Sequence, residues 1–144
     1  MWPRNVKSIP SVKAVMTPFP HSIEVSEPTT RAREMMAGHG FHHLPVMDRG
    51  ELVGVISEPD LRRAESADSG AHQVADVTRQ EAFVVDLSEP LDQVLSKMAR
   101  RQVGSALVVK EDRLAGIFTV TDACRCFAEC LRAQFPGEGG DEAA

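Results

Sequence analysis

An internal repeat constrains this chain more than any other feature of its sequence. Residues 12–64 align with residues 74–126 at a constant offset of 62 positions and without a gap. Twelve of the 53 aligned pairs are identical, including Ser26-Glu27-Pro28 with Ser88-Glu89-Pro90, and many other pairs are apolar in both copies. Chance similarity rarely keeps one register over so many positions, so we interpret the repeat as a duplication.

Each copy is predicted to fold as strand, helix, strand, strand, helix. In the second copy, Phe83-Val84-Val85 has the composition of a strand. The helix that follows has an apolar stripe at helical spacing, formed by Leu91, Val94, Leu95 and Met98. Ser26 and Ser88 are expected to cap the first helices, with the nearby proline in the first turn. A hairpin and a closing helix, beginning near Pro59 and near Thr121, complete each copy.

The length of one copy indicates that neither folds alone. About 60 residues is marginal for an independent core, so the two copies are expected to pack sheet against sheet about a pseudo-twofold axis. The fold class is therefore α/β (α+β), with two βαββα repeats. The expected domains are residues 10–65 and 74–134, joined by a small and polar linker at 66–73 and followed by a flexible tail at 135–144.

Composition argues against several functional classes. The formal net charge of -5 over 144 residues argues against non-specific nucleic-acid binding, which needs a basic surface. No apolar run approaches the roughly 18 residues of a membrane span. The first residues also lack the apolar core of a signal peptide. We expect a cytoplasmic protein with neither a nucleic acid nor a membrane as partner.

The last helix of the second copy is expected to be longer than its counterpart and to form an interface. Cys124, Cys126 and Cys130 lie on it at spacings that match neither a zinc pair nor a disulfide framework, so no metal site is expected. Two of these cysteines share an apolar face with Phe127 and Leu131. Soluble monomers usually avoid such an exposed patch, so we predict a homodimer with Phe127 and Leu131 at or beside the contact. The alternative is that this face covers the chain's own core.

Several segments resemble the motifs of tandem cystathionine-β-synthase (CBS) domain pairs, also called Bateman modules. They are Val15-Met16-Thr17-Pro18, Gly40-Phe41-His42-His43-Leu44-Pro45-Val46, Gly54-Val55-Ile56-Ser57-Glu58-Pro59-Asp60 and Gly116-Ile117-Phe118-Thr119-Val120-Thr121-Asp122. The resemblance covers about residues 10–130. It implies a regulatory, non-catalytic module that binds adenosine-containing ligands in two clefts between the copies. The expected ligand is AMP, ADP or ATP, with S-adenosylmethionine as second choice, and no cofactor is required.

Two equivalent carboxylates are the candidate ribose contacts. Asp60 and Asp122 lie just inside helix starts, and one carboxylate can accept hydrogen bonds from both hydroxyls of a ribose. Ser57 and Thr119 place a hydroxyl three residues earlier, and a helix N-terminus suits phosphate. The same Ser/Thr-x-x-Asp pattern is also a capping box that needs no ligand, and the two interpretations are compatible.

The two copies are not equal at this motif. In the second copy, Thr119 and Thr121 supply two hydroxyls around the helix start. In the first copy, Pro59 replaces the second hydroxyl, and Glu58 adds a negative charge that opposes a phosphate. The cleft served by Thr119 and Asp122 is therefore predicted to be the better ligand site.

A pair of histidines is the candidate phosphate contact. The resemblance implies this role, because His42 and His43 lie where the regulatory subunit of AMP-activated protein kinase, which contains CBS domains, has a His-Arg pair that contacts phosphates. Strand neighbours point to opposite faces, so only one of the two is expected in a given cleft. The alternative is an exposed pair without a role. Catalysis by either histidine as a base is not expected, because no nucleophile or metal cluster accompanies them.

The base of the ligand is expected against the segments that lead into the first strands, Thr17–Ile23 and Arg79–Val85. Four residues in or beside them are candidate contacts: Thr17, Pro20, Thr78 and Phe83. The alternative for Phe83 is a plain core position, and the alternative for Pro18-Phe19-Pro20 is an ordered loop. We expect ligand occupancy to be signalled to a separate, unidentified effector protein. The alternative function is a ligand-free dimerisation scaffold.

Overall fold

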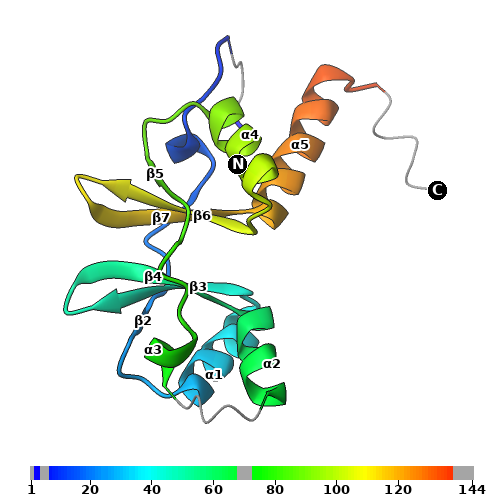
Figure 1. The fold of residues 1–144 in the computed structure, drawn as a ribbon. Helices are drawn as coiled ribbons and strands as arrows, with labels where there is room; N and C mark the ends of the chain where they lie inside the picture. The colour runs from blue at the N-terminus through cyan, green and yellow to red at the C-terminus, as the bar shows by residue number, and fades with distance from the viewer. Residues whose placement is uncertain (1, 4–6, 68–72, 138–144) are drawn as a thin grey trace.

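Two stacked halves make up the molecule, which a computed structural model describes over residues 2–3, 7–67 and 73–137 (Figure 1). The lower half contains a three-stranded sheet of order β2-β3-β4. Its strands are β2 (Ile23–Glu24), β3 (His43–Asp48) and β4 (Glu51–Ser57), and its main helices are α1 (Thr29–His39) and α2 (Glu58–Ser66). These two helices lie on the side of the sheet that faces away from the other half (Figure 1).

The upper half repeats this arrangement around a four-stranded sheet of order β1-β7-β6-β5. Its elements are β1 (Thr17–Pro18), β5 (Val84–Asp86), α4 (Leu91–Arg101), β6 (Ser105–Lys110), β7 (Arg113–Thr119) and α5 (Val120–Gln134). The hairpins β3–β4 and β6–β7 have register irregularities at equivalent positions, after Val46 and after Val108. The predicted α/β fold with two βαββα repeats is confirmed.

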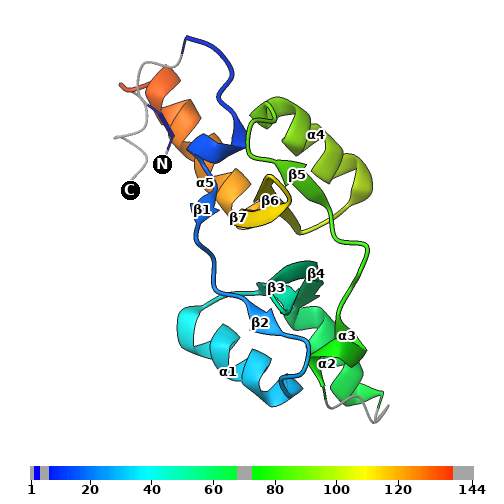
Figure 2. The ribbon, with the colours of Figure 1, turned by 90° about the vertical axis from the view of Figure 1, so that its left-hand side faces the viewer.

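Each half takes one short helix from the other copy of the repeat. The helix η1 (Val12–Ala14) packs on the upper half, and α3 (Val74–Val77) packs on the lower half. The first residue of η1 donates its N–H to the carbonyl of Glu89, and the first residue of α3 donates to Glu27, both at 2.9 Å. Figure 2 shows the two crossing segments, residues 12–22 and 74–84, running between the halves. The sequence did not indicate this exchange.

Two glycines allow the crossing segments to lie directly against the sheets. A Cβ on Gly116 would lie 2.9 Å from the carbonyl oxygen of Thr17 and would overlap the side chain of Met16. A Cβ on Gly54 would overlap the carbonyl oxygen of Arg79. Glycine at these two places allows a close approach of two backbones. Each glycine lies three residues before the capping hydroxyl of its copy, Ser57 or Thr119.

The helices α1 and α4 begin later than predicted. Ser26 and Ser88 were expected as N-caps, but the N-caps are Pro28 and Pro90, both extended and without a side-chain capping bond. Each proline forms an isolated antiparallel β-bridge with the residue just before a crossing segment, Pro90 with Ser11 and Pro28 with Gln73. That pairing holds the proline out of the helix, and the prediction is wrong because the pairing partner is distant in sequence.

The apolar core consists of three clusters. One lies under each sheet, and each includes residues of the exchanged helices, Val12 above and Val74 below. The third is a small cluster of Val55, Leu107 and Ile117 where the two halves meet. The shared clusters support the prediction that neither copy folds alone, because each cluster contains residues of both copies.

Two predicted features fall partly outside the described residues. Of the linker at 66–73, only residues 66, 67 and 73 are described, and Ser66 is the last residue of α2. Of the tail at 135–144, the description ends at residue 137. Among the helices that are described, none combines the length and the apolar character needed to cross a bilayer.

Candidate functional site

A cavity of about 680 Å³ lies where the two halves meet. It is lined by residues from three parts of the chain that are far apart in sequence: residues 17–21, residues 39–43 with Pro45, and residues 117, 119–122 and 125 with Gly104. Seven of the eleven residues singled out from the sequence line it, namely Thr17, Pro20, His42, His43, Thr119, Thr121 and Asp122. The first crossing segment makes this possible, because it brings residues 17–21 against the end of β7.

The start of α5 forms one wall of the cavity, and a capping box fixes its geometry. The N–H of Thr119 donates to Asp122 Oδ2 at 2.9 Å, and the N–H of Asp122 donates to Thr119 Oγ1 at 3.1 Å. Arg125, one turn further along, donates from Nη1 to Asp122 Oδ1 at 3.2 Å. The carboxylate of Asp122 is therefore held in place beside a guanidinium, on a residue that is 8% exposed.

Both histidines of the pair line the same cavity. Because β3 begins at His43 and His42 precedes the strand, the strand alternation behind the expectation of a single histidine does not apply to this pair. The ring of His43 lies against the other half, where a Cβ on Gly104 would be 2.8 Å from His43 Nε2. Burial, and then the neighbouring charge of His42, lower the pKa of His43 below its usual 6.5, although Asp60 opposes this shift.

A stack of aromatic rings at the cavity was not foreseen. The rings of His21 and His39 are stacked with centroids 4.4 Å apart, and His39 stacks on Phe41 at 5.2 Å. The repeat register held a signal for it, because an offset of 62 places His21 opposite Phe83, which was singled out in the other copy. Phe19 also lines the cavity, with its side chain 92% exposed and a backbone φ of 48°.

The other four predicted residues do not line this cavity. Ser57 and Asp60 form a second capping box at the start of α2, with the N–H of Asp60 donating to Ser57 Oγ at 3.2 Å. Thr78 donates its hydroxyl to the carbonyl of Val74 at 2.7 Å. Phe83 is buried in the core of the upper half. These residues belong to the equivalent position on the other side of the pseudo-twofold axis.

The side chains of that second position are already engaged with one another. Asp60 Oδ1 accepts from Arg79 Nε at 3.0 Å and from Arg63. The guanidinium of Arg101 lies 4.9 Å from the centroid of the Phe83 ring. Burial raises the pKa of Asp60, but hydrogen bonds from Ser57 and Arg79, together with the charge of Arg79, outweigh it and hold that pKa below its usual value.

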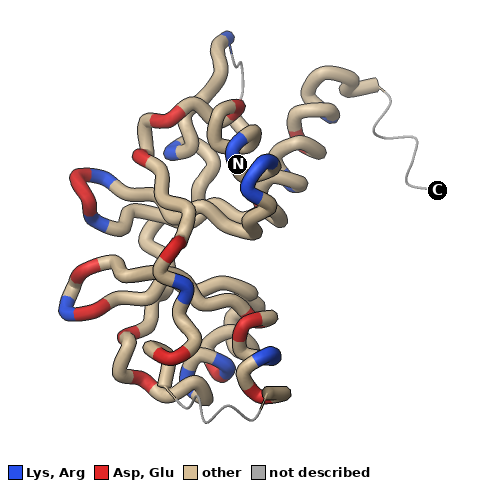
Figure 3. The backbone as a smooth tube through the Cα atoms, viewed as in Figure 1, with Lys and Arg blue, Asp and Glu red and all other residues tan. Residues whose placement is uncertain are grey.

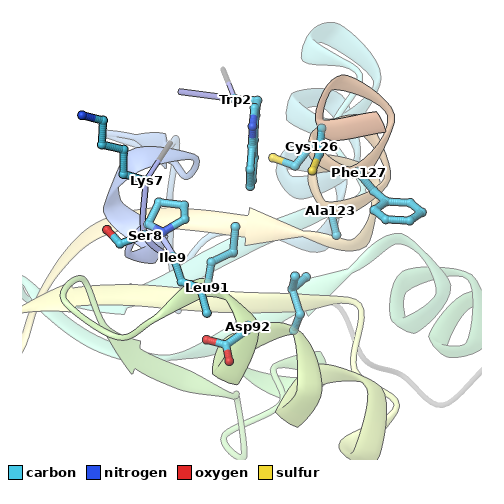
Figure 4. A pocket seen from close by; sticks show the side chains of 12 residues that line it. Trp2, Lys7, Ser8, Ile9, Leu91, Asp92, Ala123, Cys126 and Phe127 are labelled. Carbon is cyan, nitrogen blue, oxygen red and sulfur yellow. The ribbon is translucent and has the colours of Figure 1, made fainter. Parts of the chain in front are cut away.

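A second cavity, of about 410 Å³, lies between the N-terminal segment, α4 and α5 (Figure 4). Its walls are mainly apolar, and Trp2 covers one side, with its backbone N–H donating to Glu129 at 2.7 Å. Cys126 and Cys130 line it, and all three cysteines of the chain are free. Burial raises the pKa of the Cys126 thiol. Basic and acidic residues alternate along both halves of the backbone (Figure 3).

The fold and the first cavity define a class of protein, a duplicated βαββα module with a ligand-sized cavity where its repeats meet. The family model for the CBS domain matches residues 12–67 and 74–129, which together make up most of the chain. The chain belongs to the CBS domain family, and the resemblance found in the sequence is confirmed.

Known proteins support this assignment. The CBS domain pair of protein MJ0100, solved with 5′-methylthioadenosine and S-adenosyl-L-methionine, superposes with a TM-score of 0.80 at 26% identity, over 85% of this chain and 99% of that one. CBSX2, solved with AMP, superposes with a TM-score of 0.77 at 26% identity, over 85% and 99%. A homoserine O-acetyltransferase of Methanocorpusculum labreanum is 29% identical over 85% of this chain, which spans about a quarter (25%) of that enzyme's length.

Proposed function

We propose that this chain is a non-enzymatic regulatory module that binds an adenosine-containing ligand in the cavity between its repeats. AMP, ADP or ATP is the expected ligand, ahead of S-adenosylmethionine. One observation carries the proposal: the cavity places a fixed carboxylate, a helix N-terminus and two histidines around a volume of about 680 Å³. That volume falls within the range of small-molecule sites. Solved CBS pairs that hold AMP or S-adenosyl-L-methionine are similar to it over 85% of the chain.

Each part of the ligand has a matching group in the cavity. Asp122 is the proposed acceptor for both ribose hydroxyls, because a carboxylate forms strong charge-assisted hydrogen bonds. The hydroxyls of Thr119 and Thr121, with the N-terminal end of α5, are the proposed phosphate contacts. His42 and His43 complete this phosphate region, since imidazole gains charge readily beside an anion.

The base is proposed to lie against the first crossing segment. Phe19 presents an exposed ring there, and the face of a purine can stack on an aromatic ring. The backbone of Pro18 and Pro20 on either side offers carbonyl groups but no N–H donors, so it can accept from the exocyclic amino group of adenine and donates nothing to a guanine carbonyl.

The output of the module is proposed to pass through a homodimer and a separate effector protein. Phe127 and Leu131 on α5 are 65% and 43% exposed, whereas Cys126 and Ala123 of the same helix pack on the core of the upper half. Leu95 of α4 is also exposed. A second copy of the chain, related by a twofold axis, is the proposed occupant of this face.

Thermal denaturation with AMP, ATP and S-adenosylmethionine tests the ligand, with GMP as the control that keeps the phosphate and changes the base. A ligand that binds only the folded state at about 100 times its Kd stabilises it by about 2.7 kcal/mol, which raises Tm by several degrees. A rise with AMP or ATP and none with GMP is the expected result. No rise with any adenosine ligand would refute the proposal in favour of a ligand-free dimerisation scaffold.

A further inference from the structure

The two halves place different side chains at equivalent positions around the helix starts. We call the cavity beside Asp122 the first site, and the equivalent group of Ser57, Asp60, Arg79, Phe83 and Arg101 the second site. In the first site, Thr17 lies on the crossing segment and pairs with Ile117 of β7. In the second site, Arg79 forms the equivalent pair with Val55, through backbone hydrogen bonds of 2.9 and 3.1 Å. The backbones match, but a guanidinium replaces a hydroxyl.

The guanidinium of Arg79 takes up acceptor capacity of the Asp60 carboxylate that the ribose hydroxyls would need. Asp60 accepts from the N–H and hydroxyl of Ser57, at 3.2 and 2.6 Å, and from the guanidinium groups of Arg63 and Arg79. A carboxylate offers about four lone-pair sites, so these four donors leave no acceptor for the hydroxyls of a ligand. Asp60 is 5% exposed while the side chain of Arg79 is 61% exposed. The guanidinium therefore covers the carboxylate from the solvent side.

The aromatic positions beside the crossing segments also differ between the two sites. In the first site, the rings of His21 and His39 stack on each other beside the cavity. At the same two repeat positions the second site has Phe83 and Arg101. Phe83 is only 5% exposed, and the guanidinium of Arg101 lies over its ring at 4.9 Å. A cation over an aromatic face is a favourable contact that a stacked base would have to displace.

We infer that the second site is occupied by the chain's own Arg79 and Arg101, so that the module binds one ligand per chain, in the first site, and not two. This inference rests on the proposed function. It assigns to the two arginines the role of internal competitors for the groups that a ligand would contact.

The test exchanges residues between the sites and counts ligands by calorimetric titration with AMP and with adenosine. Adenosine is included because Pro59 has no hydroxyl and Glu58 adds a negative charge at the second helix start, which leaves the second site little to bind a phosphate. The parent protein is expected to bind one molecule per chain. The double variant Arg79→Thr, Arg101→His carries the residues found in the first site, and its expected stoichiometry for adenosine is two. Arg79→Ala provides a second route to the same opening if the double variant folds poorly.

The reverse exchange is the matched control. Thr17→Arg places a guanidinium beside Asp122 and is expected to weaken AMP binding at the first site at least tenfold, with circular dichroism verifying that the fold persists. Two ligands per parent chain would overturn the inference, and so would a stoichiometry that stays at one in folded Arg79→Thr, Arg101→His and Arg79→Ala variants. If the parent binds no adenosine ligand at all, the proposed function itself fails, which is a different result.

Discussion

Replacing the two equivalent aspartates one at a time distinguishes the role of each carboxylate in ligand binding from its role in helix capping. Asp122→Ala removes the carboxylate proposed to hold the ribose, whereas Asp60→Ala removes one that is occupied by Ser57, Arg63 and Arg79. Hydrogen bonds to a charged group contribute about 1.5–3 kcal/mol each, and two that share one carboxylate are not additive. We take about 3 kcal/mol for the pair, which predicts a loss of roughly a hundredfold in AMP affinity for Asp122→Ala. Asp60→Ala is expected to change that affinity by less than about threefold, or 0.6 kcal/mol.

Stability is expected to follow the opposite order. Both variants lose half of a capping box, which costs about 1 kcal/mol and lowers Tm by about 4 °C. Asp60→Ala also leaves Arg63 and Arg79 without their shared partner, so its Tm should fall further than that of Asp122→Ala. Calorimetric titration with AMP and thermal denaturation of both variants without ligand measure the two effects separately. Equal losses of affinity, or a larger loss for Asp60→Ala, would refute the assigned difference between the sites.

Three further perturbations follow from the structure. Burial and the neighbouring imidazole lower the pKa of His43, so its ring gains a positive charge only below pH 6.5. Affinity for AMP, but not for adenosine, is therefore expected to rise as the pH falls through that region. Equal pH profiles for the two ligands would contradict this. Phe127→Glu combined with Leu131→Glu is expected to convert a dimer into a monomer in light scattering, and a monomeric parent would rule out the proposed interface. Gly116→Ala is expected to cost about 1–3 kcal/mol through overlap with the crossing segment. Its control is Gly38→Ala inside α1, where nothing lies within 4 Å of the added Cβ, and this variant should stabilise the folded protein by about 0.5–1 kcal/mol. A Gly116→Ala protein as stable as the parent would show that the crossing segment can move aside.

The order of elements could be predicted from the sequence because each element is set by local patterns. The apolar stripe of α4 and the capping motif at the start of α5 depend on residues three or four positions apart. The exchange of η1 and α3 between the halves could not be predicted in this way. Val12 and Val74 are identical in the two copies, so the pattern is the same whichever half each one packs against. Which half each valine packs against depends on the path of the two crossing segments, and a single sequence does not determine that path.

The parts of the candidate site that could be predicted are those whose motif occurs in both copies of the repeat. The motif that contains Thr119 and Asp122 was visible because it occurs twice, and the structure places it on the wall of a cavity. The aromatic stack of His21 and His39 was missed because its residues differ between the copies and carry no local motif. The ion pair between Asp60 and Arg79 was missed because its partners are brought together only by the second crossing segment.

Helix α5 connects the first site to the proposed dimer surface within one rigid element. Its first turn holds Asp122, and Leu131 lies nine residues further on, about 14 Å along the axis at 1.5 Å per residue. A ligand that binds the start of this helix differently in monomer and dimer must shift the dimerisation equilibrium by the same factor, since coupling between two binding events is reciprocal. A typical coupling of 1–3 kcal/mol predicts a change of about 5- to 150-fold in the dimer dissociation constant when AMP is present. Sedimentation equilibrium with and without AMP measures it, and Asp122→Ala provides the control, in which the weakened binding should leave little effect at an AMP concentration that saturates the parent. An unchanged dissociation constant at saturating AMP would show that the signal leaves the cavity by another route than α5.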